Sequence, residues 1–282
     1  MFISILKKLI LFLIIFKYIK NKMSKKLLIE DASGKLIDLF PNSKSNTIKA
    51  IKPKVVTEDL GKIFEMAICL LYNTPYNGKY KYSLSAAENL SNKISNIKKL
   101  LPNTLIHTAK NGSRYDFTLT DTDQVEYVSA KTTKKGDKVC PQVIGQPSKK
   151  KFCSYFELDN SISISDIKLY IEENVHKMLE KYFEYTFDCP IIYYNQQQDL
   201  CLFIKKREDI EWSKHKIEFS HIIKGKEWNE STSITSQGST LGEFQVHNHR
   251  DNIKFRWNLL NVIKMFENNF EVTKIMNDTI IK

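Results

Sequence analysis

The chain has 282 residues, 42% of them hydrophobic and 27% charged, which predicts one elaborated α/β domain or one domain with appendages. Lys and Arg outnumber Asp and Glu by 43 to 32. The net charge of +11 favours a polyanionic partner, nucleic acid first and an anionic membrane second. Five cysteines without a Cys-x-x-Cys pair argue against a disulfide framework and a structural zinc site. We therefore expect a reducing compartment, the cytoplasm or the interior of a host cell.

The first segment, residues 1–22, is hydrophobic and basic. Lys7 and Lys8 interrupt it, and the apolar run Leu9–Phe16 is shorter than the roughly 20 residues of a membrane-spanning helix. A signal peptide would need a small-residue cleavage site, which is missing here. Because Met23 is a plausible second start, the segment is either an upstream extension of the reading frame or a weak anchor. Membrane association is expected only if it is translated.

Residues 23–56 are polar and contain glycine and prolines, which predicts a loosely ordered lead-in with a short strand or turn. The next segment, 57–72, has apolar residues at helical spacing and acids in its first turn, and it predicts an amphipathic helix. Glu65 falls at the border of the apolar stripe, where a carboxylate would be partly exposed. It is either a surface acid on the helix flank or a group directed at a site.

A second helix is predicted over residues 83–101, and a strand over 105–108. Two runs rich in β-branched and aromatic residues, 115–120 and 125–132, then flank a polar Asp-Thr-Asp-Gln turn. This pattern predicts a β-hairpin.

Alternation along the hairpin decides which side chains share a face. Tyr127, Ser129 and Lys131 lie on one face of the second strand. Asp116 starts the partner strand, so an Asp and a Lys can meet on the sheet. An Asp can hold Mg²⁺ against a phosphate, and a nearby lysine can stabilise charge on an attacking water. The alternative is a solvated sheet edge.

A polar and basic segment follows the hairpin. Gln142 and Gln146 are four residues apart, and either amide could orient a water or a phosphate. We select Gln146, because it lies nearer the helix that begins with Pro147 in its first turn. Lys149, Lys150 and Lys151 offer point charges to a DNA backbone, or they form a solvated face.

The C-terminal part mixes helices and strands. A long helix is predicted from Ser165 to Tyr182, followed by strands over 190–194 and 200–204. Residues 241–257 predict strand, turn and strand, and residues 259–266 a helix. This order suits an α/β sandwich with a central mixed β-sheet flanked by helices.

The strand pair in 241–257 predicts a polar platform. Gln245, His247 and His249 share one face, and Lys254 and Arg256 share a face of the next strand. Such a surface suits base edges and phosphates, with Arg256 suited to guanine and Gln245 or Asn248 to adenine.

Asp116 and Lys131 resemble the core of the PD-(D/E)xK nuclease superfamily, whose fold is restriction-endonuclease-like. In that superfamily a hairpin carries an Asp and, further along, an acid, any residue and a Lys. Ser129 occupies the position of the second acid, a departure that some restriction enzymes share while bringing an acid from elsewhere. The resemblance covers about residues 57–260, and 241–257 look like the C-terminal part of some type II restriction enzymes.

The resemblance implies a Mg²⁺-dependent endonuclease that acts on double-stranded DNA and can form a homodimer. Its nuclease-like domain would span 57–282, with a DNA-contacting part from about residue 200. Asp116 and Glu65 would bind the metal, Lys131 would position and activate water, and Gln146 would assist. Two alternatives remain open: an inactive DNA-binding protein on the same fold, and a membrane-tethered protein of unknown role. The implied DNA contacts are Lys149, Lys150, Lys151, Gln245, His247, Asn248, Arg250, Lys254 and Arg256.

Overall fold

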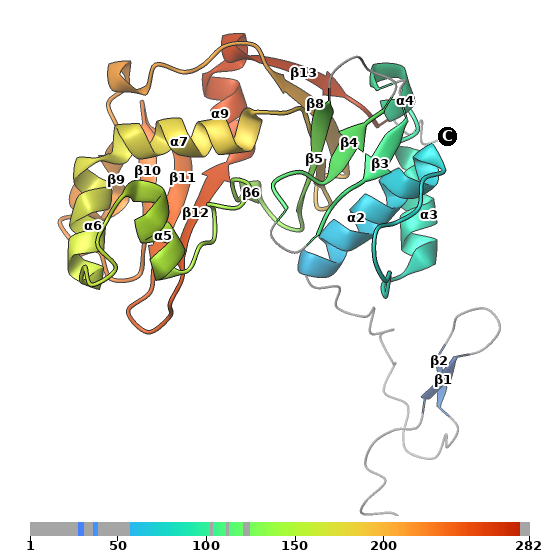
Figure 1. Ribbon diagram of the computed structural model, residues 1–282, viewed down its shortest axis with the longest axis horizontal. Helices are drawn as coiled ribbons and strands as arrows, with labels where there is room; N and C mark the ends of the chain where they lie inside the picture. The colour runs from blue at the N-terminus through green and yellow to red at the C-terminus, as the bar shows by residue number, and fades with distance from the viewer. Residues whose placement is uncertain are drawn as a thin grey trace, which may run out of the picture. The chain divides into compact units, whose positions relative to one another are not determined.

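The computed structural model describes residues 57–101, 104–110, 113–120 and 125–276, and the backbone of 28–30 and 36–38 (Figure 1). The chain divides into two compact units, Met1–Lys54 and Val55–Lys282. In the first unit, β1 (Leu28–Glu30) and β2 (Leu36–Asp38) pair antiparallel. The predicted N-terminal anchor at 1–22 and the hairpin turn at 121–124 lie outside the described residues. Within the described part, no helix combines the length and apolar character needed to cross a membrane.

The second unit contains a six-stranded mixed sheet with the order β13-β8-β7-β5-β4-β3. The β5–β7 pair is parallel, and the other neighbouring pairs are antiparallel. The predicted hairpin is present, with Phe117 of β4 opposite Val128 of β5. The strands are β3 (Leu105–His107), β4 (Phe117–Leu119), β5 (Glu126–Thr133), β7 (Ile191–Asn195), β8 (Leu200–Lys206) and β13 (Phe270–Lys274).

Helices cover both faces of this sheet. On one face α2 (Thr57–Tyr72), α3 (Leu84–Lys93) and α4 (Ile97–Leu100) bury a core in which Phe64 stacks on Tyr194, with ring centroids 5.5 Å apart. On the other face, Phe187 of α7 (Val175–Phe187) packs against Phe270 of β13. The predicted sandwich, a central mixed sheet flanked by helices, is confirmed and is consistent with a restriction-endonuclease-like fold.

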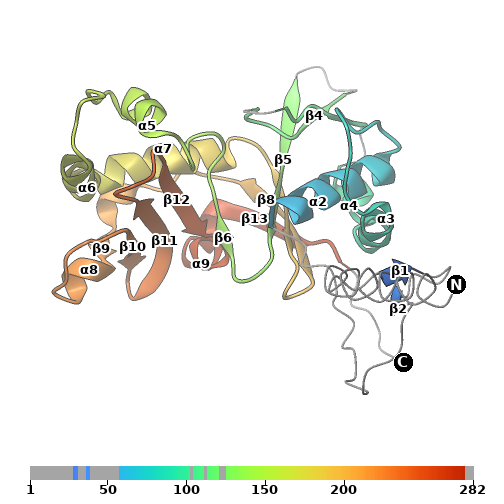
Figure 2. The ribbon, with the colours of Figure 1, turned by 90° about the horizontal axis from the view of Figure 1, so that it is seen from below.

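A second sheet is five-stranded and antiparallel, with the order β6-β12-β11-β10-β9. Helices α5 (Lys149–Phe156), α6 (Ile164–Glu173) and α7 pack along one face (Figure 2), where Tyr182 stacks on Phe255 at 4.3 Å. Because α7 contacts both sheets, it ties them into one unit. The strands are β6 (Lys138–Val139), β9 (Glu218–Phe219), β10 (Ser231–Ser236), β11 (Ser239–Val246) and β12 (Ile253–Asn258); α8 (Ser220–Ile223), α9 (Leu259–Met265) and two short 3₁₀ turns, Trp212–Lys214 and Glu267–Asn269, complete the unit.

Helix boundaries differ from the predictions at three places. The helix predicted over 83–101 is divided into α3 and α4 by a turn at 94–96. The single helix predicted over 165–182 is broken into α6 and α7 at Asn174, whose backbone and side-chain amides both donate to the carbonyl of Tyr170. This bonding ends α6, as Asn favours caps over helix interiors. The helix predicted to hold Pro147 in its first turn begins at Lys149 instead, because the hydroxyl of Ser148 caps it by accepting from the Lys151 N–H.

Candidate active site

β4 and β5 separate next to Asp116 and Ser129. Their pairing ends at Phe117 opposite Val128, and from Ser129 onward β5 pairs with β7 along its other edge. In the resulting gap, Asp116 Oδ2 accepts hydrogen bonds from the Ala130 N–H at 2.8 Å and from the Ser129 hydroxyl at 2.7 Å. The carboxylate therefore satisfies backbone that the departing strand leaves unpaired.

Lys131 belongs to the same hydrogen-bonded chain. Its ammonium donates to Gln142 Oε1, and Gln142 Nε2 donates to the hydroxyl of Ser129. Asp116 and Lys131 thus lie on one side of β5, as strand alternation predicts, and two polar side chains separate them. We call these four residues, Asp116, Ser129, Lys131 and Gln142, the fork.

Gln142 occupies the place for which the sequence suggested Gln146. Gln142 is buried, and its N–H donates to the Tyr185 carbonyl at 3.3 Å. Gln146 is exposed, and its amide lies 3.1 Å from the sulfur of Cys140. Two glutamines four residues apart look alike in sequence, and only the path of the chain after β6 separates them.

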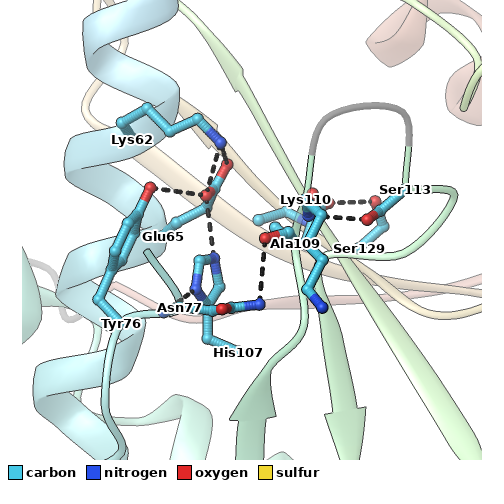
Figure 3. Close-up of polar contacts among 11 residues, drawn as sticks. Lys62, Glu65, Tyr76, Asn77, His107, Ala109, Lys110, Ser113 and Ser129 are labelled. Carbon is cyan, nitrogen blue, oxygen red and sulfur yellow. Dashed lines mark hydrogen bonds and ion pairs between the residues drawn. The ribbon is translucent and has the colours of Figure 1, made fainter. Parts of the chain in front are cut away.

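Glu65 is 6% exposed, more deeply buried than its position at the border of the stripe predicts. Figure 3 shows its carboxylate between Lys62, Tyr76 and His107. Lys62 Nζ lies 2.9 Å from Oε2, His107 Nε2 3.0 Å and the Tyr76 hydroxyl 3.4 Å. Burial opposes ionisation of Glu65, but His107 and Lys62 together outweigh it and hold the pKa below its ordinary value of 4.5.

The tautomer of His107 follows from its second contact. The Asn77 N–H donates to Nδ1 at 2.8 Å, so Nδ1 carries no proton and the Nε2–H donates to Glu65. The imidazole also stacks on Tyr76 at 4.3 Å. Sequence analysis passed over His107, because the contact joins residues 42 positions apart.

Glu65 and the fork occupy different faces of the sheet. His107 is the cross-strand partner of Phe117, and both belong to the face that α2 covers. Ser129 and Lys131 alternate with Val128, which is buried on that face. Among the described residues, no hydrogen bond or ion pair joins Glu65 to the fork, and no three His, Cys, Asp or Glu side chains gather closely enough to hold a metal ion.

A second carboxylate, Asp188, lies in the neighbourhood of the fork. It pairs with Arg114 at 2.9 Å and accepts from the Tyr115 hydroxyl at 2.5 Å. Burial, reinforced by the charge of Asp188, raises the pKa of the adjacent Cys189 thiol to about 12. The Ser129 N–H of the fork donates to the carbonyl of Pro190 at 2.9 Å, two residues after Asp188.

Of the predicted platform, Gln245, Lys254 and Arg256 share one face of β11 and β12, whereas His247 and His249 lie beyond the end of β11. The centre of this face is a residue that sequence analysis missed. Glu243 lies opposite Arg256, and Gln245 lies opposite Lys254. Glu243 accepts from Arg256 Nη2 at 3.0 Å, from Gln245 Nε2 at 3.1 Å and from Lys138 Nζ at 2.5 Å. We use the term platform for these five residues.

The other predicted DNA contacts are spread around this sheet. His247 Nδ1 lies 3.1 Å from Glu230, and Asn248 accepts from Lys168 at 3.3 Å. Arg250 is exposed in the turn between β11 and β12. Of the lysines that open α5, Lys149 is half-buried, whereas Lys150 and Lys151 are exposed.

The chain after β6 connects the fork with the platform. It runs beside β12, where the Phe255 N–H donates to the Gly145 carbonyl at 2.8 Å. Gly145 approaches Pro141 so closely that a Cβ would lie 2.7 Å from the Pro141 carbonyl oxygen, which requires glycine there.

One thiol in this segment reports on both regions. Burial raises the pKa of Cys140, and the hydrogen bond from Gln146, followed by nearby positive charges, opposes the rise. These charges belong to Lys131 of the fork and to Lys254 and Arg256 of the platform. Gln142 of the fork lies three residues before Gly145, whose carbonyl accepts from β12 of the platform, so this segment joins the two regions.

Comparison with known proteins adds one relative. The chain is 46% identical over 220 residues to the type II restriction enzyme CviAII of Paramecium bursaria Chlorella virus 1. The alignment covers 78% of this chain and 63% of that enzyme, so the chain spans less than two thirds of the relative's length. No family model and no solved structure matches the chain. The relative is thus a type II restriction enzyme, the class of enzyme whose C-terminal part residues 241–257 resemble.

Proposed function

We propose that this chain is a metal-dependent endonuclease that hydrolyses phosphodiester bonds of double-stranded DNA, of the type II restriction kind. The observation that carries the proposal is the fork, in which an aspartate and a lysine are held on one side of β5 by Ser129 and Gln142. The similarity to a restriction enzyme over 78% of the chain supports it. The excess of positive charge suits a DNA substrate.

The fork suits Mg²⁺. Asp116 Oδ1 accepts no hydrogen bond from the described part of the chain, so one carboxylate oxygen is open to a cation. Mg²⁺ is commonly held by one or two carboxylates together with waters and substrate phosphate oxygens, so it does not require a cluster of three protein acids. When bound, the ion supplies a Lewis acid that polarises the phosphate and acidifies water.

Lys131 performs the next task. Its ammonium would position the attacking water and neutralise charge that develops on the phosphate oxygens. Gln142 Oε1 holds the ammonium, and the Ser129 hydroxyl holds Gln142 in turn. We therefore assign the assisting role to Gln142, in preference to Gln146, whose amide contacts Cys140.

Glu65, the second metal ligand that the resemblance implies, lies on the α2 face of the sheet and would act on the metal only as a distant anion. Its carboxylate is ionised by His107 and Lys62, which suits a distant anionic partner of the metal. For direct coordination Glu65 would have to exchange one of these contacts for the ion. Asp188, two residues before the Pro190 carbonyl that accepts from Ser129, is a further acid that could serve in place of the one that Ser129 replaces.

DNA would lie across the platform and the start of α5. Lys254, Arg256 and Gln245 present polar groups on one face of β11 and β12, and Lys150 and Lys151 offer exposed charge to phosphates. His247, Asn248 and Arg250 line the turn at the end of this strand pair. A homodimer would present two such surfaces to a two-fold symmetric site.

The test is cleavage of supercoiled plasmid by the full chain with Mg²⁺, with EDTA as the control. We expect linear or nicked product with Mg²⁺ and none with EDTA. Gel shift in Ca²⁺ is measured in parallel. Binding in Ca²⁺ without cleavage in Mg²⁺ or Mn²⁺ would replace the proposal with an inactive DNA-binding protein, and neither binding nor cleavage would remove both.

A further inference from the structure

Glu243 is a buried acid at the centre of a surface that is otherwise open. It is 7% exposed, and it receives hydrogen bonds from Lys138, Arg256 and Gln245. Burial opposes ionisation, but the hydrogen bond from Lys138 and the charge of Arg256 outweigh it and lower the pKa. A buried carboxylate of this kind is maintained only when its partners remain in place.

Arg256 depends on this acid for its position. The two residues are direct cross-strand partners, and Nη2 is the guanidinium atom that contacts Glu243, at 3.0 Å. The Nε of Arg256 is buried without an acceptor, and Nη1 donates to none of the described residues. Glu243 is thus the acceptor that orients a guanidinium whose side chain remains 30% exposed.

The surrounding charges make this anchoring necessary. Lys138, Lys254 and Arg256 are three cations on neighbouring strands, and their mutual repulsion would spread them without an anion between them. Glu243 joins two of them directly. It therefore sets both the direction of Arg256 and the local density of positive charge.

A guanidinium held at Nη2, with Nη1 free of hydrogen bonds to the described residues, can read guanine. Arginine donating in parallel to O6 and N7 of guanine is the commonest base-specific contact in the major groove, and an antiparallel strand pair fits that groove. We propose that Glu243 is a positioning residue that determines specificity, because it holds Arg256 so that its remaining donors read a guanine of the DNA site. This inference rests on the proposed function.

The experiment compares wild type with Glu243→Gln, which keeps the shape of the side chain and removes its charge. Each protein digests a randomised double-stranded DNA library in Mg²⁺, and the cut ends are sequenced. Arg256→Lys, which keeps a positive charge but loses the planar guanidinium group, is digested alongside. Glu218→Gln, which breaks the ion pair between Glu218 of β9 and Lys216 just before that strand, is the matched control.

We expect Glu243→Gln to lose about tenfold or more of the preference for guanine at one position, because the bidentate contact of Arg256 is no longer held in place. Arg256→Lys should lose the preference at that same position, and Glu218→Gln should keep it. Removing a negative charge should leave binding to non-specific DNA equal or tighter. If Glu243→Gln is not folded by circular dichroism, the double variant Glu243→Gln/Lys138→Met, which also removes the unpaired cation, replaces it.

The inference fails if Glu243→Gln selects the same sites as wild type, or if it and Arg256→Lys lose preference at different positions. A wild-type protein that cuts no DNA contradicts the proposed function instead. In that case the same libraries are selected by binding in Ca²⁺, and the same comparison of positions decides the role of Glu243.

Discussion

The fork and the platform use the same kinds of side chain in different ways. Each has a carboxylate, a lysine and a glutamine. In the fork, the Asp116 carboxylate accepts from a backbone N–H and a hydroxyl, and Gln142 and Ser129 stand between it and Lys131. In the platform, lysine and arginine bind the carboxylate of Glu243 directly.

This difference assigns the two regions different tasks. An acid held by neutral donors keeps its negative charge for a cation, whereas an acid bound by two cations is already neutralised. The proposed function would therefore place chemistry at a phosphate in the fork, and in the platform the holding and orienting of positive groups that would contact DNA. Changes in the fork should alter the rate of cleavage, and changes around the platform should alter binding and site choice.

The largest effect is expected from Lys131→Met. Losing the ammonium that stabilises developing charge should lower single-turnover cleavage by about 10²–10³-fold. Binding in Ca²⁺ should persist, since the platform is intact. Lys93→Met, at a surface ion pair with Asp199, is the control and should cut like wild type. A Lys131 variant that cuts at the wild-type rate would remove the distinction between the regions.

The second comparison sets Gln142→Ala against Gln146→Ala. Gln142 orients the lysine, so its loss should reduce the rate by about 10–100-fold, the usual effect of removing a supporting hydrogen bond. Gln146→Ala should have little effect, because the Gln146 amide contacts Cys140 and not Lys131. Plasmid cleavage under identical conditions measures both, and the reverse ranking would restore Gln146 to the site.

Glu65 extends the comparison, because the charge of its carboxylate, like that of Glu243 in the platform, is balanced by neighbouring side chains. Glu65→Gln should lower the free energy of unfolding by about 1–3 kcal/mol at pH 7, because His107 and Lys62 lose an ionised partner in a buried site. Since the folded pKa lies below the ordinary 4.5, this stabilisation is present above that pH and is lost as the pH falls through the folded pKa.

Urea unfolding of wild type and Glu65→Gln at pH 7 and at pH 3 measures this dependence. The difference in unfolding free energy between the two proteins should shrink at the acid pH. A difference that stays constant would mean that the Glu65 charge contributes nothing to stability. Glu211→Gln, at an exposed ion pair with Lys214, should show no such change.

The smallest effect is expected from Lys150→Ala/Lys151→Ala. For each lysine that binds a phosphate, its removal should reduce the slope of log affinity against log salt by about 0.9, while single-turnover cleavage at saturating DNA stays unchanged. Lys79→Ala/Lys81→Ala removes the same charge from another exposed segment and is the control. Equal slopes for the two double variants would place Lys150 and Lys151 on a solvated face.

The sheet elements that position the fork could be predicted because their signals are local. Alternation placed Ser129 and Lys131 on one face, and β-branched runs marked both strands of the hairpin. The broken helix could not be predicted from its stripe, because Ile167, Ile171 and Val175 keep their spacing across the break, and the cap formed by Asn174 ends α6.

The partners of the site residues could not be predicted, because they come from distant segments. His107 contacts Glu65 across 42 residues, and Lys138 contacts Glu243 across 105. The path of the chain along β12 decides that Gln142, and not Gln146, contacts Lys131. This path depends on tertiary pairing and not on a local sequence pattern. Sequence patterns thus indicated faces, whereas contacts between elements decided which polar groups meet.

The central claim is that Asp116 holds the catalytic metal in the fork, and Asp116→Asn tests it most directly. The variant keeps the size of the side chain and removes the charge that a cation requires. Plasmid cleavage in Mg²⁺ should fall by at least about 10²-fold, while Asp209→Asn, at an exposed ion pair with Lys206, cuts like wild type. Cleavage by Asp116→Asn at the rate of Asp209→Asn would contradict the account.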